Sequence, residues 1–279
     1  MSTEFISFLG PTASLAAYDP TKPAAKQESK DIPTAFKDAM TVRQRVFVEE
    51  QGVALENEFD GDDPRCYHWV VYASVGTTNG HSNGANSSSS DPLDDPAAPA
   101  RRNSTANRVA VGTIRLVPPP HPAHPAPSDH HKFDNSLHAP PTICSGNGHD
   151  QLRRNSDGSA DGSTAKPVEP YIKLGRMAIL PAYRKLGLAA LLVRTALEWA
   201  RQNANEVLSP PPPEAVELAR VEGRESELEA WRGLCLVHAQ AAIERWWTKF
   251  GFVTDQSMGV WDEEGIDHVG MWLRVKVKE

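Results

Sequence analysis

The densest pattern of apolar positions in the chain lies between residues 171 and 201. Residues 172–180 form an apolar run that Pro181 bounds, which is typical of a buried strand. After it, side chains recur at helical spacing at Leu188, Leu191, Leu192, Thr195, Ala196 and Trp199. The pattern predicts a strand that runs directly into a helix.

The turn between this strand and this helix has the sequence Arg-Lys-Leu-Gly-Leu-Ala, residues 184–189. A glycine turn ahead of a helix leaves backbone N–H groups without acceptors, and the helix dipole adds partial positive charge there. Arg184 and Lys185 add further positive charge, so the turn is predicted to bind phosphate. An ordinary strand–turn–helix, in which Gly187 serves only close packing, remains the alternative.

Other periodic segments lie on both sides of this unit. Residues 33–52 have a helical apolar stripe that Gly52 ends. Residues 239–250 predict a second helix of this kind, with Trp246 and Trp247 on its inner side. Alternating or apolar runs predict strands at 5–9, 67–75, 109–117, 234–237 and 269–277, with a turn at 262–267 before the last of them.

Three stretches interrupt this pattern. Residues 76–108 and 118–169 are rich in Gly, Ser, Asp, Pro and His and are expected to be disordered. Residues 206–231 begin with prolines and continue with strong helix formers, so a partly helical insertion is expected. The interpretation is a single domain over residues 31–279 with three insertions, preceded by an N-terminal segment, 1–30, that is flexible after its short strand.

Composition narrows the function classes. The chain has 279 residues and a formal net charge of −7 without a stripe of Lys and Arg, which argues against nucleic-acid binding. No apolar run is long enough to span a bilayer, and the N-terminus lacks the features of a signal peptide. Cys66, Cys144 and Cys235 are too scattered for a disulfide framework, which favours a reducing compartment.

Two features of the insertions concern sites other than the predicted phosphate turn. The six histidines of the second insertion follow no metal-ligand spacing and predict no metal site: His121, His124, His130, His131, His138 and His149. The tetrapeptide Arg-Arg-Asn-Ser ends at Ser104 and again at Ser156 and resembles sites of basic-directed kinases, with chance recurrence as the alternative.

Four motifs together resemble one enzyme family. Arg184-x-x-Gly187-x-Ala189 is similar to the acetyl-CoA pyrophosphate loop of the Gcn5-related N-acetyltransferases (GNAT). Residues 42–53, VRQRVFVEEQGV, resemble the substrate-side helix of the ElaA-like subgroup. Residues 238–252 and 263–271 resemble its later strand–helix and final-strand motifs. The motifs occur in the family's order between about residues 34 and 278.

The resemblance implies a fold and a cofactor site. It implies a mixed α/β sheet with helices on both faces, in which the parallel strands ending near Ile179 and Val237 splay apart and admit acetyl-CoA between them. A strand N–H free at such a splay stabilises the oxyanion of a thioester under attack, a role that falls to Met177. The residues expected to bind acetyl-CoA are Met177, Ala178, Ile179, Arg184, Lys185, Leu186, Gly187, Leu188, Ala189, Trp247 and Lys249.

The acceptor amine requires a base, because alkyl amines are mostly protonated at neutral pH. The candidate bases are Glu56, Glu58 and Asp60 in an acidic loop, with His238 and His268 near the expected wedge. The carboxylates of Glu50, Glu56, Glu58 and Asp60 are also expected to bind a cationic amine. A solvated turn and structural imidazoles are the alternatives.

One position departs from the family pattern. GNAT enzymes commonly carry a tyrosine four residues before a Gly-Phe pair, where it protonates the departing thiolate, and this chain has Trp247. Tryptophan has no proton to give at neutral pH. Trp247 is therefore expected to wall the pantetheine channel or to fill the core.

The resulting hypothesis is an acetyl-CoA-dependent N-acetyltransferase that acts directly on a small primary amine, with amino sugars and polyamines as leading classes. Acetylation of a protein or peptide is one alternative, and a catalytically weak CoA-binding regulatory protein is the other. A cytoplasmic location is expected, with a nuclear one and a homodimer left open.

Overall fold

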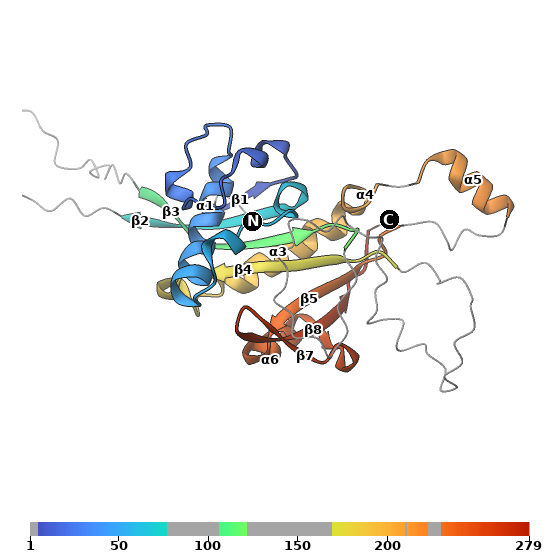
Figure 1. Ribbon diagram of the computed structural model, residues 1–279. Helices are drawn as coiled ribbons and strands as arrows, with labels where there is room; N and C mark the ends of the chain where they lie inside the picture. The colour runs from blue at the N-terminus through green and yellow to red at the C-terminus, as the bar shows by residue number, and fades with distance from the viewer. Residues whose placement is uncertain (1–4, 77–105, 122–168, 210, 223–229, 279) are drawn as a thin grey trace, which may run out of the picture.

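Strand β4 (Ile172–Ile179) lies in the middle of a mixed sheet in the computed structural model, which describes residues 5–76, 106–121, 169–209, 211–222 and 230–278. Within these residues the strands run in the order β1-β2-β3-β4-β5-β8-β6, and β7 pairs with β8 (Figure 1). The other strands are β1 (Ile6–Leu9), β2 (Tyr67–Gly76), β3 (Ala106–Val117), β5 (Leu234–Gln240), β6 (Val253–Thr254), β7 (Val260–Glu263) and β8 (Ile266–Arg274).

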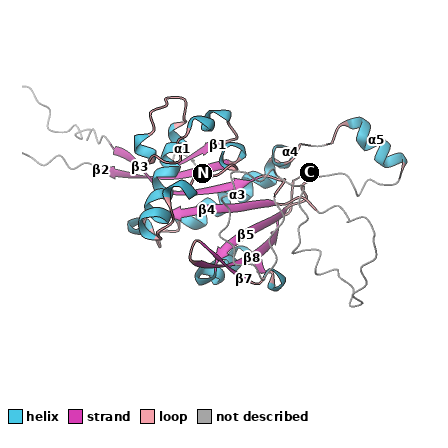
Figure 2. Cartoon of the chain, viewed as in Figure 1, coloured by secondary structure: helices cyan, strands magenta, loops and turns pink. Residues whose placement is uncertain are grey.

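Helices cover both faces of this sheet (Figure 2). One face packs against α3 (Leu188–Gln202), whose inner residues join the main core. The other face packs against α1 (Thr34–Arg43) and the π-helical segment η3 (Gln44–Glu50), which place Val42 and Val46 on Ala178. The shorter helices are α4 (Ala204–Val207), α5 (Pro213–Val221) and α6 (Glu244–Trp247). No helix in the described part of the chain has the length and apolar character that a membrane span requires.

A bulge in β4 changes which side chains face each layer. Ile172 and Leu174 belong to the core under α3, whereas Ala178 belongs to the cluster under α1. Strict alternation along a strand would put all three on one face. The register with β3 shifts at this point, and Arg176 adopts a left-handed φ of 49°. The extra residue therefore reverses the alternation halfway along the strand.

Strands β4 and β5 form the parallel pair of this sheet, and they pair only at their beginnings. Cα partners run from Ile172 with Cys235 to Leu174 with Val237. Beyond these residues the strands diverge toward their carboxyl ends (Figure 1). The expected splay between two parallel strands is confirmed.

Most of the expected elements are present with shifted ends. The helix expected over residues 33–52 divides into α1 and η3, and Gly52 follows with a φ of 80°. Strand β5 continues to Gln240, so the expected end at Val237 was wrong. The helix expected at 239–250 is a series of short turns around α6. In the third insertion α5 ends at Val221, and residues 223–229 lie outside the described residues.

The N-terminal segment differs from the expectation of flexibility. After β1, Leu15, Tyr18 and Ala24 are buried in a cluster with Phe36 and Phe59. Tyr18 stacks on Phe59 with ring centroids 4.9 Å apart. Residues 10–30 therefore extend the core beside α1, because two short 3-10 helices, Ala13–Ala17 and Ala24–Lys26, bring isolated apolar side chains onto that helix.

The two long insertions lie mostly outside the described residues, which omit 77–105 and 122–168. Ser104, Ser156 and Cys144 fall in these gaps. At the edges, β3 begins at Ala106, and His121 is buried with Nε2 2.8 Å from the carbonyl oxygen of Tyr171. Disorder was therefore the wrong expectation for residues 106–108 and 118–121.

We expect Leu192→Ala to destabilise the domain because Leu192 is fully buried between α3 and the sheet. Such a cavity in a core costs about 2–5 kcal/mol of unfolding free energy. Leu191→Ala is the matched control, since the neighbouring Leu191 is 44% exposed and its loss should cost under about 0.5 kcal/mol. Urea unfolding of both variants measures the difference, and equal costs would contradict the packing described here.

Candidate active site

A cavity of about 540 Å³ lies in the wedge between β4 and β5. Residues 173–179 of β4 form one wall, and His238 and Gln240 of β5 form the opposite wall. Elements from both faces of the sheet border it: Phe47, Glu50 and Gln51 with η3, and Ala189 of α3 with Trp246 and Trp247 of α6. The cavity is thus bordered by groups from both layers of the domain.

The turn before α3 has the backbone form of an anion site. Lys185 and Gly187 both have left-handed φ values, 65° and 81°. Gly187 caps α3 without a side-chain hydrogen bond, so the first N–H groups of the helix have no acceptor within the helix. A Cβ built on Gly187 would meet no atom within 4 Å. Backbone conformation, not close packing, therefore requires glycine at this position.

Arg184 links the turn to η3. Its Nη1 donates to Glu50 Oε1 at 2.7 Å, and its Nε donates to the carbonyl oxygen of Ile179 at 3.0 Å. The hydrogen bond from Arg184 lowers the pKa of Glu50. Glu50 was expected to bind the acceptor amine, but the structure places its carboxylate on Arg184 instead.

The end of β4 presents backbone amides to the wedge. The Leu180 N–H donates to the carbonyl oxygen of Val111 on the β3 side at 2.9 Å. Successive N–H groups of a strand point to opposite neighbours, so the Ile179 amide points toward β5, and the Met177 amide does likewise. Strand β4 pairs with β5 only as far as Leu174, so the Met177 and Ile179 amides face the cavity.

Trp247 forms an aromatic wall of the cavity. It is 4% exposed and packs edge-on against Trp246 and Phe252. Its indole Nε1 is buried without a hydrogen-bond partner among the described residues. The placement agrees with a wall residue, whereas Lys249 is exposed and does not line the cavity.

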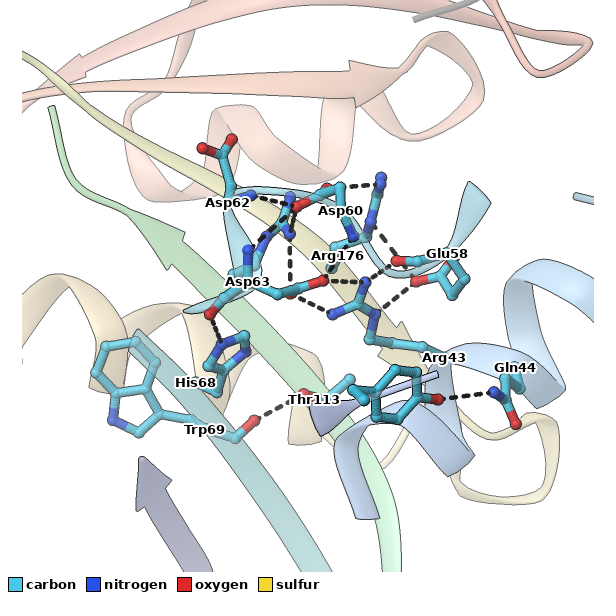
Figure 3. A network of polar contacts seen from close by, with 12 residues as sticks. Arg43, Gln44, Glu58, Asp60, Asp62, Asp63, His68, Trp69, Thr113 and Arg176 are labelled. Carbon is cyan, nitrogen blue, oxygen red and sulfur yellow. Dashed lines mark hydrogen bonds and ion pairs between the residues drawn. The ribbon is translucent and has the colours of Figure 1, made fainter. Parts of the chain in front are cut away.

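A buried ionic network occupies the place expected for a cation-binding loop (Figure 3). Arg43 donates to Glu58 and, at 2.8 Å, to Asp63 Oδ1. Arg115 donates to Asp60 Oδ1 at 2.7 Å and to Asp63, and Arg176 donates to Asp60 Oδ2 at 3.1 Å. Three arginines neutralise three carboxylates, so Glu58 and Asp60 offer no unpaired charge to an amine.

The network sets the ionisation of the groups it contains. Burial alone would raise the pKa of Asp63, but Arg43 and Arg115 outweigh it and hold that pKa well below its usual range. Burial lowers the pKa of His68 to about 4, although Asp63 opposes the change. His68 is therefore neutral in the folded protein at pH 7, with Nε2 3.1 Å from the Asp63 carbonyl oxygen.

Both candidate histidines lie at the cavity, beside a residue that sequence reasoning missed. His238 Nδ1 is 3.6 Å from Glu263 Oε2, and the His238 ring meets Trp261 edge-on at 4.9 Å between centroids. His268 Nδ1 is 2.7 Å from the carbonyl oxygen of Ile266. Glu263 was missed because the sequence pattern assigned it to a turn. In the structure it lies in β7, two residues after Trp261, and both side chains are buried on the same face of the strand.

The structure brings together some of the expected site residues and separates others. The residues that line the cavity are Glu50, Met177, Ala178, Ile179, Arg184, Lys185, Ala189, His238, Trp247 and His268. The residues outside its lining are Leu186, Gly187, Leu188 and Lys249 on the cofactor side, and Glu56, Glu58 and Asp60 in the acidic loop. Glu58 lines a separate cavity of about 60 Å³, which also contacts Glu263 and His268. Within the described residues no three His, Cys, Asp or Glu side chains gather as metal ligands.

The class of protein that this fold and site define is an acyl-CoA-dependent acyltransferase. Residues 152–210, which include β4 and α3, match the model of the acetyltransferase (GNAT) family. The resemblance seen in the motifs is confirmed. No curated protein matches the chain.

The chain is also similar to several solved structures. A putative N-acetyltransferase from Lactobacillus plantarum has 17% identity and a TM-score of 0.42 over 97% of this chain and 99% of that one. An acyl-CoA N-acyltransferase from Pseudomonas aeruginosa has 16% identity and a TM-score of 0.40 over 97% and 99%. Escherichia coli ElaA has 13% identity and a TM-score of 0.40 over 96% and 98%. Similarities this distant do not identify a substrate.

We expect His68 to make stability depend on pH. The folded pKa of about 4 lies below the unfolded value of about 6.5, so the unfolded chain binds more protons between these values. Stability is then complete above about pH 6.5 and falls as the pH drops toward 4, by about 2 kcal/mol between pH 7 and pH 5. His68→Gln should flatten this slope in chemical unfolding measured from pH 7 to pH 5, and an unchanged slope would contradict it.

Proposed function

We propose that the protein transfers the acetyl group of acetyl-CoA to a primary amine of a small molecule, by direct attack within a ternary complex. The observation that carries this proposal is the wedge between β4 and β5, which joins a cavity to the capped turn of α3. The turn before α3 binds the phosphates of acetyl-CoA in this proposal. The wedge between β4 and β5 admits the acyl end of the same molecule.

The residues around the wedge fit acetyl-CoA. The amides of the turn at 185–189 suit the pyrophosphate, because a helix N-terminus with left-handed residues before it concentrates N–H donors. The Met177 and Ile179 amides suit the pantetheine arm and the acetyl carbonyl oxygen, whose negative charge grows during attack. Trp247 supplies an apolar wall beside them.

The acceptor would enter from the side of η3 and the β7–β8 hairpin. On this side the cavity is lined by two amides and two imidazoles, from Gln51, Gln240, His238 and His268, together with Glu263. The Gln240 side chain donates to Gln51 at 3.2 Å and so links β5 to the end of η3 at the cavity. A cavity of about 540 Å³ with convergent amides and imidazoles supports a small acceptor over a protein tail.

The two acceptor classes differ in what they need from this pocket. A polyamine needs several available carboxylates. Three arginines already neutralise Glu58, Asp60 and Asp63, and Glu263 accepts from Trp261 and faces His238. An amino sugar needs hydrogen-bonding groups for its hydroxyls, which amides and imidazoles supply. We therefore place amino sugars ahead of polyamines as acceptors.

The test is thiol release from acetyl-CoA in the presence of amino sugars, polyamines, amino acids and peptides, together with calorimetric binding of CoA. Gly187→Val should raise the Kd for CoA at least about tenfold, because a β-branched residue does not hold the left-handed turn. Gly265→Val is the matched control, since Gly265 has the same kind of φ, 82°, and equally open space, but lies in the β7–β8 turn.

Turnover confined to amino sugars supports the proposal in full. Turnover with peptides alone would favour the protein-acetylating alternative. Binding of CoA without thiol release from any acceptor would favour a regulatory CoA-binding protein, for which the Trp247 substitution is the specific observation. Equal CoA affinity in the Gly187→Val and wild-type proteins would overturn the cofactor assignment.

A further inference from the structure

Strands β5, β8 and β7 share one face, which is apolar around Trp261 and carries His238, His268 and Glu263 where it borders the cavity. In β5, Leu234 and Leu236 pack on Trp261, while Cys235 and Val237 belong to the core under α3. Alternation therefore places His238 on the Trp261 side. Cross-strand pairing sets His238 opposite Gly270 and Trp261 opposite His268, which completes this face.

Glu263 lies on this same face, two residues after Trp261 in β7. It is 9% exposed, and its Oε2 lies 3.3 Å from the indole Nε1 of Trp261, which donates to it. The same oxygen is 3.6 Å from His238 Nδ1. Trp261 thus holds the carboxylate in place and also meets the His238 ring edge-on. The carboxylate is positioned by its neighbours and is not a mobile surface group.

We propose that Glu263 is a positioning residue that orients the His238 imidazole as the proton acceptor of the reaction, an inference that rests on the proposed acyltransfer. The Glu263 carboxylate lies at ion-pair distance from Nδ1, so its charge favours the tautomer with the proton on Nδ1 and leaves Nε2 as the basic nitrogen. The ammonium form of the acceptor first loses one proton to solvent. The neutral amine nitrogen then bonds to the acetyl carbon, and its second proton passes to His238 Nε2. The carbon–sulfur bond breaks, and its electron pair leaves with the thiolate.

Other charged groups border the same cavity and contribute to the field at His238. They are Glu50, Asp62, Arg115, Lys173, Arg176, Arg184, Lys185 and His268. Glu50 pairs with Arg184, Asp62 pairs with Arg65, and Arg115 and Arg176 pair with the acidic loop. Glu263 is the carboxylate at 3.6 Å from the ring, so its removal should have the largest effect on the proton affinity of His238.

The first arm of the test needs no acceptor. In protein labelled with ¹³C at histidine Cε1, NMR titration should show His238 of the Glu263→Gln variant titrating at lower pH than in the wild type, because a neighbouring carboxylate favours the imidazolium. His238→Gln assigns the resonance. Asp262→Asn is the matched control, since Asp262 is the preceding residue of β7, points to the other face and binds the Gly265 amide. An unshifted His238 in Glu263→Gln would overturn the proposal.

The second arm is kinetic. Glu263→Gln should lower kcat about tenfold or more with little change in the KM for acetyl-CoA, and the acidic limb of the rate profile should move to lower pH. Glu263→Asp keeps the charge and should retain the limb of the wild type. A limb that stays in place in Glu263→Gln would show a purely structural role. If no acceptor turns over, the acyltransfer proposal fails, while the NMR arm still decides whether Glu263 and His238 are coupled.

Discussion

The buried ion pairs between three arginines and three carboxylates hold the substrate side of this domain together (Figure 3). Arg43 belongs to α1, Arg115 to β3 and Arg176 to the bulge of β4, and all three bind the loop at 58–63. Desolvation makes such a network costly, so burial of these charges is weak evidence for added stability. The contribution of the network is instead to fix the position of the β4 bulge. Arg176 adopts a strained left-handed φ, and its ion pair with Asp60 stabilises the bulge in that conformation.

The bulge in turn determines the chemistry available in the wedge. Because it reverses the alternation of β4, Leu174 packs under α3 while Ala178 packs under η3. The strand is thereby anchored on opposite faces before and after the bulge. Its carboxyl end separates from β5 and directs two amides into the cavity. Donor and acceptor can then approach from different layers, which direct transfer between two bound substrates requires.

The sequence predicted the strand–turn–helix unit, the splay and the two histidines because each rests on local periodicity or on a motif. It did not predict the packing of residues 10–30, since Leu15 and Tyr18 have no period that separates them from a flexible segment. The ion pairing of the acidic loop with buried arginines was also not predicted. Arg43 stood within an apolar helical stripe, and an arginine there requires buried carboxylates as partners. That requirement was the available signal for Glu58 and Asp63, but it concerns partners distant in sequence.

Trp247 affects departure of the thiolate and deprotonation of the amine differently. Its Nε1 is buried without a partner in the described part of the chain, and an indole does not release a proton at neutral pH. A thiol with a pKa near 8.5 leaves as the anion at modest cost near neutrality. The amine is different, because it begins as a cation and must lose two protons to become an amide. In the proposed reaction, proton acceptance on the His238 side is therefore the step to which side chains of this protein would contribute most.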